Sequence, residues 1–185
     1  AINNGFTWGA EVGFVGAYNI SDASYEEFDL GAEGKNPVHL KVVDGAVLTV
    51  NNTDWSATSL SRVELGQSSS DVNTLYVEGV SAGCNAAAVL GDELLFQINS
   101  ELGMRKANTV DLSPSLGTWG PASDVYYKMA TNSLNSDVYA TVTSFSASSL
   151  GQVQVLDSSG NLLSSFTAGA VPGGIAFDIR TVAVV

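Results

Sequence analysis

Residues 38–50 read VHLKVVDGAVLTV, and this segment is typical of an antiparallel β-hairpin. Apolar residues alternate on both sides of Asp44-Gly45, at Val38, Leu40, Val42, Ala46, Leu48 and Val50. A period of two indicates a strand with one buried face, and Asp-Gly is a turn pair that matches the twist of paired strands. The segment therefore predicts two strands that pair through a tight turn.

Outward from this hairpin, short apolar segments alternate with turn residues. Further strands are predicted at residues 61–65, 75–80, 93–99, 125–129, 138–142, 153–155, 162–166 and 175–179, with a terminal continuation at 182–185. Asp157 to Asn161 predicts a hairpin turn with positive φ at Gly160, whereas the alanines of residues 84–90 favour a helical turn. Consecutive strands argue against a parallel α/β sheet. They predict an all-β fold, a single antiparallel β-sandwich of jelly-roll-like or immunoglobulin-like topology.

The opening segment, residues 6–20, reads FTWGAEVGFVGAYNI and extends the same period of two. It predicts an extended strand of about fifteen residues, roughly 50 Å long, with one aromatic face. That strand either packs within its own domain or enters a neighbouring subunit. We therefore divide the chain into an extended N-terminal donor strand, 1–20, and a β-sandwich domain, 21–185. The expected subunit interface consists of Phe6, Trp8, Ala10, Val12 and Phe14.

Composition and charge narrow the classes of partner. Seven Lys and Arg against nineteen Asp and Glu give a net charge of -12. Without a basic cluster, nucleic-acid binding is not expected. No apolar run approaches the length of a membrane-spanning helix. A start at Ala1 and a neutral-polar surface lead us to expect an exported protein, extracellular or on the cell surface. Cys84, the single cysteine, permits no internal disulfide and is expected to be buried and inert.

An acidic segment follows the opening strand, with Asp22, Glu26, Glu27 and Asp29 close together. Carboxylates at this density repel one another unless they are solvated or bound to a cation. Calcium accepts oxygen ligands from such loops, although the spacing matches no EF-hand. Both a solvated loop and a calcium site are consistent with the segment, and no other cofactor is expected.

Two further patterns concern carbohydrate. Asn19 and Asn51 each begin an N-x-S/T sequence, the acceptor pattern for N-glycosylation. Exposed aromatic residues on a sheet face would bind surface glycans, and the candidates are Trp55, Trp119, Tyr126 and Tyr127. We favour the simpler interpretation that these four are ordinary core or rim aromatics.

One motif resembles a catalytic site. Gly79 to Gly83 fits G-x-S-x-G, the turn that carries a serine nucleophile in α/β-hydrolases. That chemistry needs a histidine downstream, but the only histidine, His39, lies upstream. We therefore predict no catalytic residues and no enzymatic activity.

The opening FTWGAEVGFVGAY and the late run DVYATVTSFSASSLGQVQVLDSSGNLLSSFTAGAVPGGIAFDIRTVAVV resemble subunits of exported β-sandwich filaments. Those families are the TasA-like biofilm fibres and the archaeal bundling pili. The resemblance implies a jelly-roll-like subunit of a homopolymer, which donates its N-terminal strand to the next copy. The expected function is thus a structural subunit of an extracellular filament or pilus. The alternatives are a virion capsid or tail protein and a secreted carbohydrate-binding or adhesion module.

Overall fold

The computed structural model describes residues 2–3, 7–66, 71–99, 101–146 and 148–180. Within these ranges no helix is long and apolar enough to cross a membrane. The strands are β1 (Ile2–Asn3), β2 (Gly13–Asn19), β3 (Ser24–Asp29), β4 (Pro37–Val43), β5 (Ala46–Asn51), β6 (Thr58–Glu64), β7 (Val72–Glu78), β8 (Ala87–Leu90), β9 (Glu93–Phe96), β10 (Arg105–Asn108), β11 (Tyr126–Thr131), β12 (Val138–Val142), β13 (Gln152–Leu156) and β14 (Leu162–Thr167).

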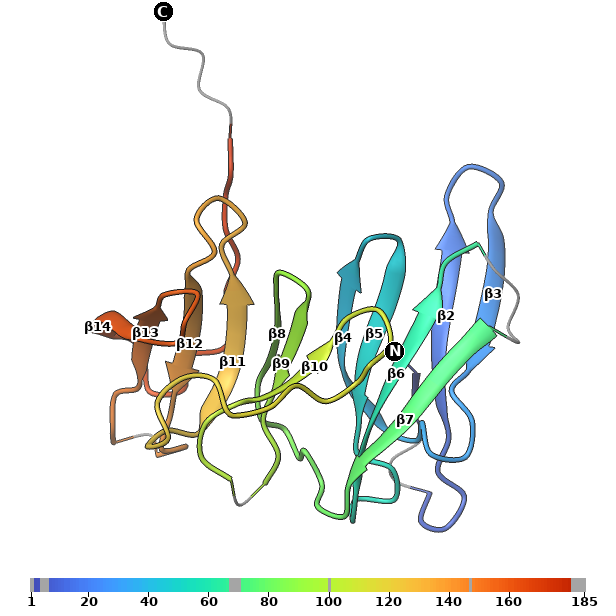
Figure 1. Ribbon diagram of the computed structural model, residues 1–185, viewed down its shortest axis with the longest axis horizontal. Helices are drawn as coiled ribbons and strands as arrows, with labels where there is room; N and C mark the ends of the chain where they lie inside the picture. Colours follow the sequence, from blue (N-terminus) through green and yellow to red (C-terminus); the bar gives the residue numbers. More distant parts are fainter. Residues whose placement is uncertain (1, 4–6, 67–70, 100, 147, 181–185) are drawn as a thin grey trace, which may run out of the picture.

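These strands form four antiparallel sheets. Their orders are β1-β2-β3, β4-β5-β6-β7, β10-β9-β8 and β11-β12-β13-β14, so strands that follow one another in the chain are paired. Figure 1 shows the sheets following one another along the long axis, from β2 and β3 at the right to β14 at the left. The predicted all-β, sandwich-like fold is confirmed, although it contains more layers than the two sheets of a simple sandwich.

Three apolar cores join the four sheets in series. The first core joins β1–β3 to β4–β7 and contains Val15, Phe28, Leu30, Val47 and Val63. The second core joins β4–β7 to β8–β10 and includes Leu48, Val50, Leu60, Leu94, Phe96 and Ile98. The third core joins β8–β10 to β11–β14 and includes Leu95, Met104, Trp119, Tyr126, Met129 and Val138.

Strand alternation explains how one sheet can serve two cores. Successive side chains of a strand point to opposite faces. Leu94 accordingly lies in the second core and Leu95 in the third. Val47 and Leu48 divide in the same way between the first and second cores. The two inner sheets are therefore apolar on both faces.

The hairpin predicted at residues 38–50 is present as β4 and β5. Its register places Val43 opposite Ala46 across the turn. Asp44 and Gly45 have φ values of 46° and 79°, the pair of positive angles that a type I′ turn requires. The Asp-Gly signal thus identified both the turn and the register.

The predicted fifteen-residue opening strand is wrong for residues 7–12. The chain turns at Thr7 to Ala10, where the Ala10 N–H donates to the Thr7 carbonyl and Gly9 has a φ of +81°. Strand β2 begins only at Gly13 and pairs with β1 on one side and β3 on the other. Period-two alternation alone did not reveal this turn. Phe6 lies outside the described residues.

The buried face of β2 is also opposite to the one predicted. Val15 is 1% exposed, whereas Tyr18 is 62% and Ile20 is 89% exposed. Val15 lies opposite Phe28 in the register, and both residues pack against Val47 of the next sheet. Packing between sheets selected the aliphatic face of β2 and left its aromatic face outside.

The helical turn predicted at residues 84–90 is wrong, because Ala87–Leu90 forms strand β8. Ala86, Ala87 and Ala88 are all buried, and the Ala86 N–H donates to the Tyr126 carbonyl at 2.9 Å. Small side chains let β8 approach β11 closely. Tertiary packing thus overrides the modest helix propensity of alanine.

Gly160 has the predicted positive φ, 85°, in the turn between β13 and β14. A Cβ at this position would collide with the backbone nitrogen of Gly120. We expect Gly160→Ala to lower the free energy of unfolding by about 2–4 kcal/mol, through backbone strain and this collision. Chemical denaturation measures the loss. Gly173→Ala is the control, because no atom lies within 4 Å of its added Cβ and its φ is not positive. Equal stability of the two variants would contradict the expectation.

Candidate interaction surfaces

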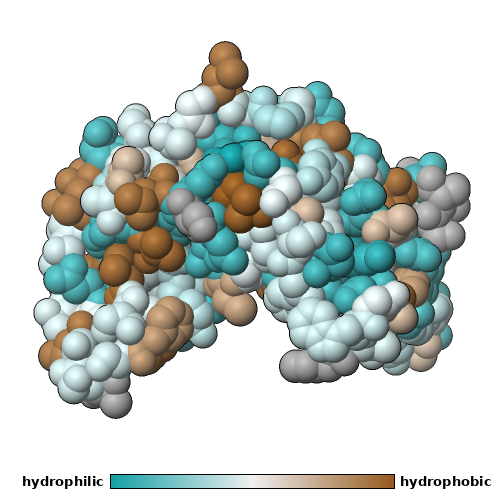
Figure 2. Space-filling view, turned by 90° about the horizontal axis from the view of Figure 1, so that it is seen from below, coloured by the Kyte–Doolittle hydropathy of each residue, from teal (hydrophilic) through white to brown (hydrophobic). Residues whose placement is uncertain are grey.

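Strand β14 is an unprotected sheet edge. All six of its residues are exposed, with Leu162, Leu163 and Phe166 at 52%, 56% and 52%. It pairs with β13 on one side only. Soluble proteins usually place charges on such edges, because the free N–H and C=O groups invite another strand. Figure 2 shows apolar side chains gathered at the left, over the end that β11–β14 form.

The other described edge strands longer than two residues are protected. Strands β3, β4, β7, β10 and β11 each carry at least one charged residue, which are Glu26, Glu27, Asp29, Lys41, Glu78, Arg105, Lys106 and Lys128. Strand β8 has no charge, but β11 covers it, and the Thr131 hydroxyl donates to the Val89 carbonyl at 2.6 Å. Among the edges that the structure describes, β14 alone is long, uncharged and uncovered.

The segment after β14 is extended but belongs to no strand. The chain crosses the ends of β13 and β12, where the Ala168 N–H donates to the Gly151 carbonyl and the Thr143 hydroxyl donates to the Ala170 carbonyl. The predicted strand at residues 175–179 is thus extended without a partner strand, and 182–185 lie outside the described residues. We call residues 171–180 the C-terminal tail. In Figure 1 the tail extends past the loops at the top of the sheet.

An aromatic pair joins the tail to its own sheet. The rings of Phe177 and Tyr139 meet edge to face, with centroids 5.1 Å apart. Within the described residues, no backbone hydrogen bond joins residues 175–179 to another segment. The backbone groups of this tail are therefore available for pairing.

A second apolar surface lies at the opposite end of the molecule. Of the predicted interface residues, Trp8, Ala10 and Val12 are exposed, Trp8 at 75%, and Phe14 is half-buried in β2. Tyr18 and Tyr25, which lie opposite each other in β2 and β3, add two exposed rings. Sequence reasoning had placed the even-numbered face of β2 inside, so it missed these rings as surface residues. The structure brings Tyr18 and Tyr25 together, and we call this pair the exposed aromatic face.

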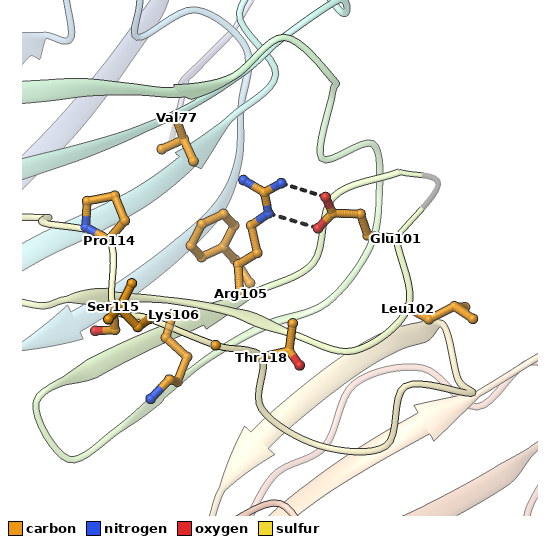
Figure 3. A pocket seen from close by; sticks show the side chains of 11 residues that line it. Val77, Glu101, Leu102, Arg105, Lys106, Pro114, Ser115 and Thr118 are labelled. Atoms are coloured by element: carbon orange, nitrogen blue, oxygen red, sulfur yellow. Dashed lines mark hydrogen bonds and ion pairs between the residues drawn. The ribbon is translucent and has the colours of Figure 1, made fainter.

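A groove of about 590 Å³ lies beside β10 (Figure 3). Arg105 extends into it and donates to both carboxylate oxygens of Glu101, at 2.8 and 2.5 Å. A third contact, at 3.3 Å, joins Arg105 to Glu78, and Lys106 pairs with Glu93 at 2.9 Å. The hydrogen bonds from Arg105 lower the pKa of Glu101. Carboxylates already hold both Arg105 and Lys106, so neither of these two cations is free to bind an anionic ligand.

The four carboxylates predicted to hold calcium do not converge. Glu26 and Glu27 are neighbours on β3, so they point to opposite faces of the sheet, and Asp22 accepts the Ser24 N–H in the preceding turn. Asp29 accepts the Gly31 N–H at the other end of the strand. Among the described residues, no three His, Cys, Asp or Glu side chains lie close enough to hold a metal ion. The four predicted calcium ligands thus do not form a cluster in the described structure.

The two glycosylation candidates differ in access. Asn19 is exposed, and its side chain accepts the Ser21 N–H. Asn51 is 0% exposed and lies in a polar network, where it accepts the Thr49 hydroxyl and donates to Ser59 and Ser61. Modification of Asn51 in the folded protein is excluded because its amide is enclosed. Asn19 alone stays a candidate acceptor.

Ser81, Trp119 and Tyr126, which the sequence offered as candidates for chemistry or glycan binding, are buried in the structure. The Ser81 hydroxyl donates to the Asn52 side chain at 2.8 Å and accepts the Gly83 N–H, so the serine of the G-x-S-x-G match is a buried, hydrogen-bonded residue of a turn. Trp119 and Tyr126 are buried core residues, which removes them from a glycan platform. Cys84 was predicted to be buried and is exposed, because it lies in the turn before β8.

His39 is a largely buried histidine. Its Nε2 lies against the carbonyl oxygen of Asn85, so this nitrogen carries the proton and donates. The pKa of His39 is lowered to about 4, chiefly by burial; the hydrogen bond to the Asn85 carbonyl opposes this shift, and the charges of Lys128 and Lys41 add to it. The folded protein therefore holds His39 neutral.

The low pKa of His39 makes folding sensitive to mild acid. In the unfolded chain His39 titrates near its ordinary pKa of about 6.5. The contribution of neutral His39 to the free energy of unfolding is therefore fully present above pH 6.5 and is lost as the pH drops toward 4. The loss attributable to His39 is about 3 kcal/mol at pH 4. Denaturation between pH 7 and 5 follows this group, because His39 is the only histidine of the chain. His39→Gln keeps an N–H donor and should flatten the slope, and an unchanged slope would contradict the assignment.

No protein-family model matches the chain, and no curated protein matches it significantly.

Proposed function

We propose that this chain is a structural subunit that assembles with copies of itself into an extracellular filament or pilus. The observation that carries this proposal is the uncharged and uncovered edge of β14. An exposed apolar edge strand pairs with other chains unless the fold prevents it. Here no charge, proline or covering segment protects the described edge. We infer that a strand of another chain covers this exposed edge of β14.

The exposed aromatic face at the opposite end supports the same function. A subunit with different contact surfaces at its two ends forms heterologous contacts, which extend into open filaments when rotation does not close them. Trp8, Tyr18 and Tyr25 supply large apolar area at the end opposite β14. Strand β2 is already paired on both sides, so Gly13–Asn19 is not available as a donated strand.

The test compares the full chain with an edge variant. Light scattering and negative-stain microscopy should show oligomers and filaments of the wild-type protein as its concentration rises. Phe166→Lys places a charge on β14 and should remove these species without changing the circular dichroism spectrum.

Tyr76→Lys is the matched control, because Tyr76 is 51% exposed on the edge strand β7, as Phe166 is 52% exposed on β14. This variant should assemble like the wild type. A wild-type chain that stays monomeric at all concentrations would overturn the proposal.

A further inference from the structure

We infer that the C-terminal tail is the strand that completes β14, and that it is donated by a second copy of the chain. This inference rests on the proposed function and identifies the contact through which assembly proceeds. The structure shows an unpaired edge and an unpaired extended segment in the same molecule. Each supplies the backbone donors and acceptors that the other lacks.

In the observed fold the tail does not pair with strand β14 of its own chain. Residues 168–170 leave β14, bond to Gly151 before β13 and reach Thr143 after β12. Phe177 then stacks on Tyr139 of β12, two strands away from β14. The crossing therefore directs the tail away from its own β14 and leaves that edge to another molecule.

The sequence of the tail suits strand addition. Ile175, Phe177 and Ile179 alternate with Ala176, Asp178 and Arg180. In a strand the first set shares one face and the second set the other. The two charges neutralise each other, since Arg180 and Asp178 form an ion pair at 2.7 Å. One face of the donated strand is thus apolar, and the other presents a neutral pair to solvent.

The tail and strand β14 also match in length and in charge. Residues 175–180 span about 20 Å when extended, which equals the roughly 20 Å of the six residues of β14. Strand β14 has no charged residue, so it would not repel Asp178 or Arg180 of a donated tail. Because the tail of one copy fills the edge of the next, the contact is heterologous and leaves a free tail and a free edge at the two ends. Repetition of this contact builds a homopolymer.

The first experiment removes and restores the donor. A chain lacking residues 171–185 should lose all species larger than a monomer, and a synthetic peptide of residues 171–185 should bind it. Phe177→Asp in the full chain should weaken assembly more than about tenfold. Ala176→Ser is the control on the opposite face of the tail and should assemble normally.

The second experiment locates the contact in the assembly. In a Cys84→Ser background, chains with Ser165→Cys on β14 are mixed with chains carrying Ala176→Cys in the tail. Oxidation should link the two kinds of chain, whereas Asn73→Cys on β7 should not link to the tail.

Three results would overturn the inference. Normal assembly of the chain without residues 171–185 refutes the tail as donor and leaves the proposed function intact. Links between two Ser165→Cys chains without links to the tail show that two β14 edges pair directly. A monomeric wild-type chain refutes both the inference and the proposed function.

Discussion

Replacing Leu94 and Leu95 together by alanine is expected to abolish cooperative folding. Each side chain is at most 1% exposed, and the two lie in different cores. A buried leucine replaced by alanine costs about 2–5 kcal/mol. Sites that share no partners act additively, so the pair removes about 4–10 kcal/mol from a total stability of roughly 5–15 kcal/mol.

Urea denaturation with tryptophan fluorescence measures this effect. Trp119 lies in the third core, so its emission reports directly on the surroundings of Leu95. The single variants should each unfold at lower urea concentration. Leu163→Ala is the matched control, because Leu163 is 56% exposed and its loss should change stability by less than about 0.5 kcal/mol. A Leu95→Ala variant as stable as this control would refute the three-core arrangement.

Asn51→Ala is expected to lower the free energy of unfolding by about 2–4 kcal/mol. The Asn51 amide satisfies the hydroxyl of Thr49 at 2.7 Å and those of Ser59 and Ser61 at 3.0 and 2.8 Å, all in the buried interior. Removing one member of a buried network leaves its partners unsatisfied, which costs about 1–3 kcal/mol for each affected group. We expect less than the full loss for all three partners, because Ser61 also bonds Thr74 and Ser59 also donates to the Glu33 carbonyl.

Asn51→Asp should destabilise the protein further at neutral pH, because it places a carboxylate where the native side chain donates two hydrogen bonds. Lowering the pH toward 4 should reduce the difference between Asn51→Asp and Asn51→Ala as the carboxylate is protonated. Thermal unfolding at several pH values measures both variants. Asn19→Asp, at an exposed position, is the control and should leave the melting temperature unchanged. Equal stability of Asn51→Asp and wild type would show that the network contributes little.

Local signals in the sequence were sufficient where neighbouring residues decide the structure. The turn at Asp44-Gly45, the positive φ of Gly160 and the antiparallel pairing of consecutive strands all follow from turn chemistry and alternation. The same signals could not separate a continuous opening strand from a short strand that follows a turn, because alternation continued through residues 7–12. Nor could they predict which face of β2 is buried, because both faces carry apolar residues.

Composition and local pattern alone therefore determined that this protein is a β-rich, acidic chain of short antiparallel strands. Only the tertiary structure decided that the sheets form a series with three cores, since stacking depends on contacts between residues distant in sequence. It also decided that β14 is an uncovered edge and that the tail is led away from it, because a free edge is a property of the assembled sheet. The site on which the proposed assembly depends was invisible in the sequence for that reason.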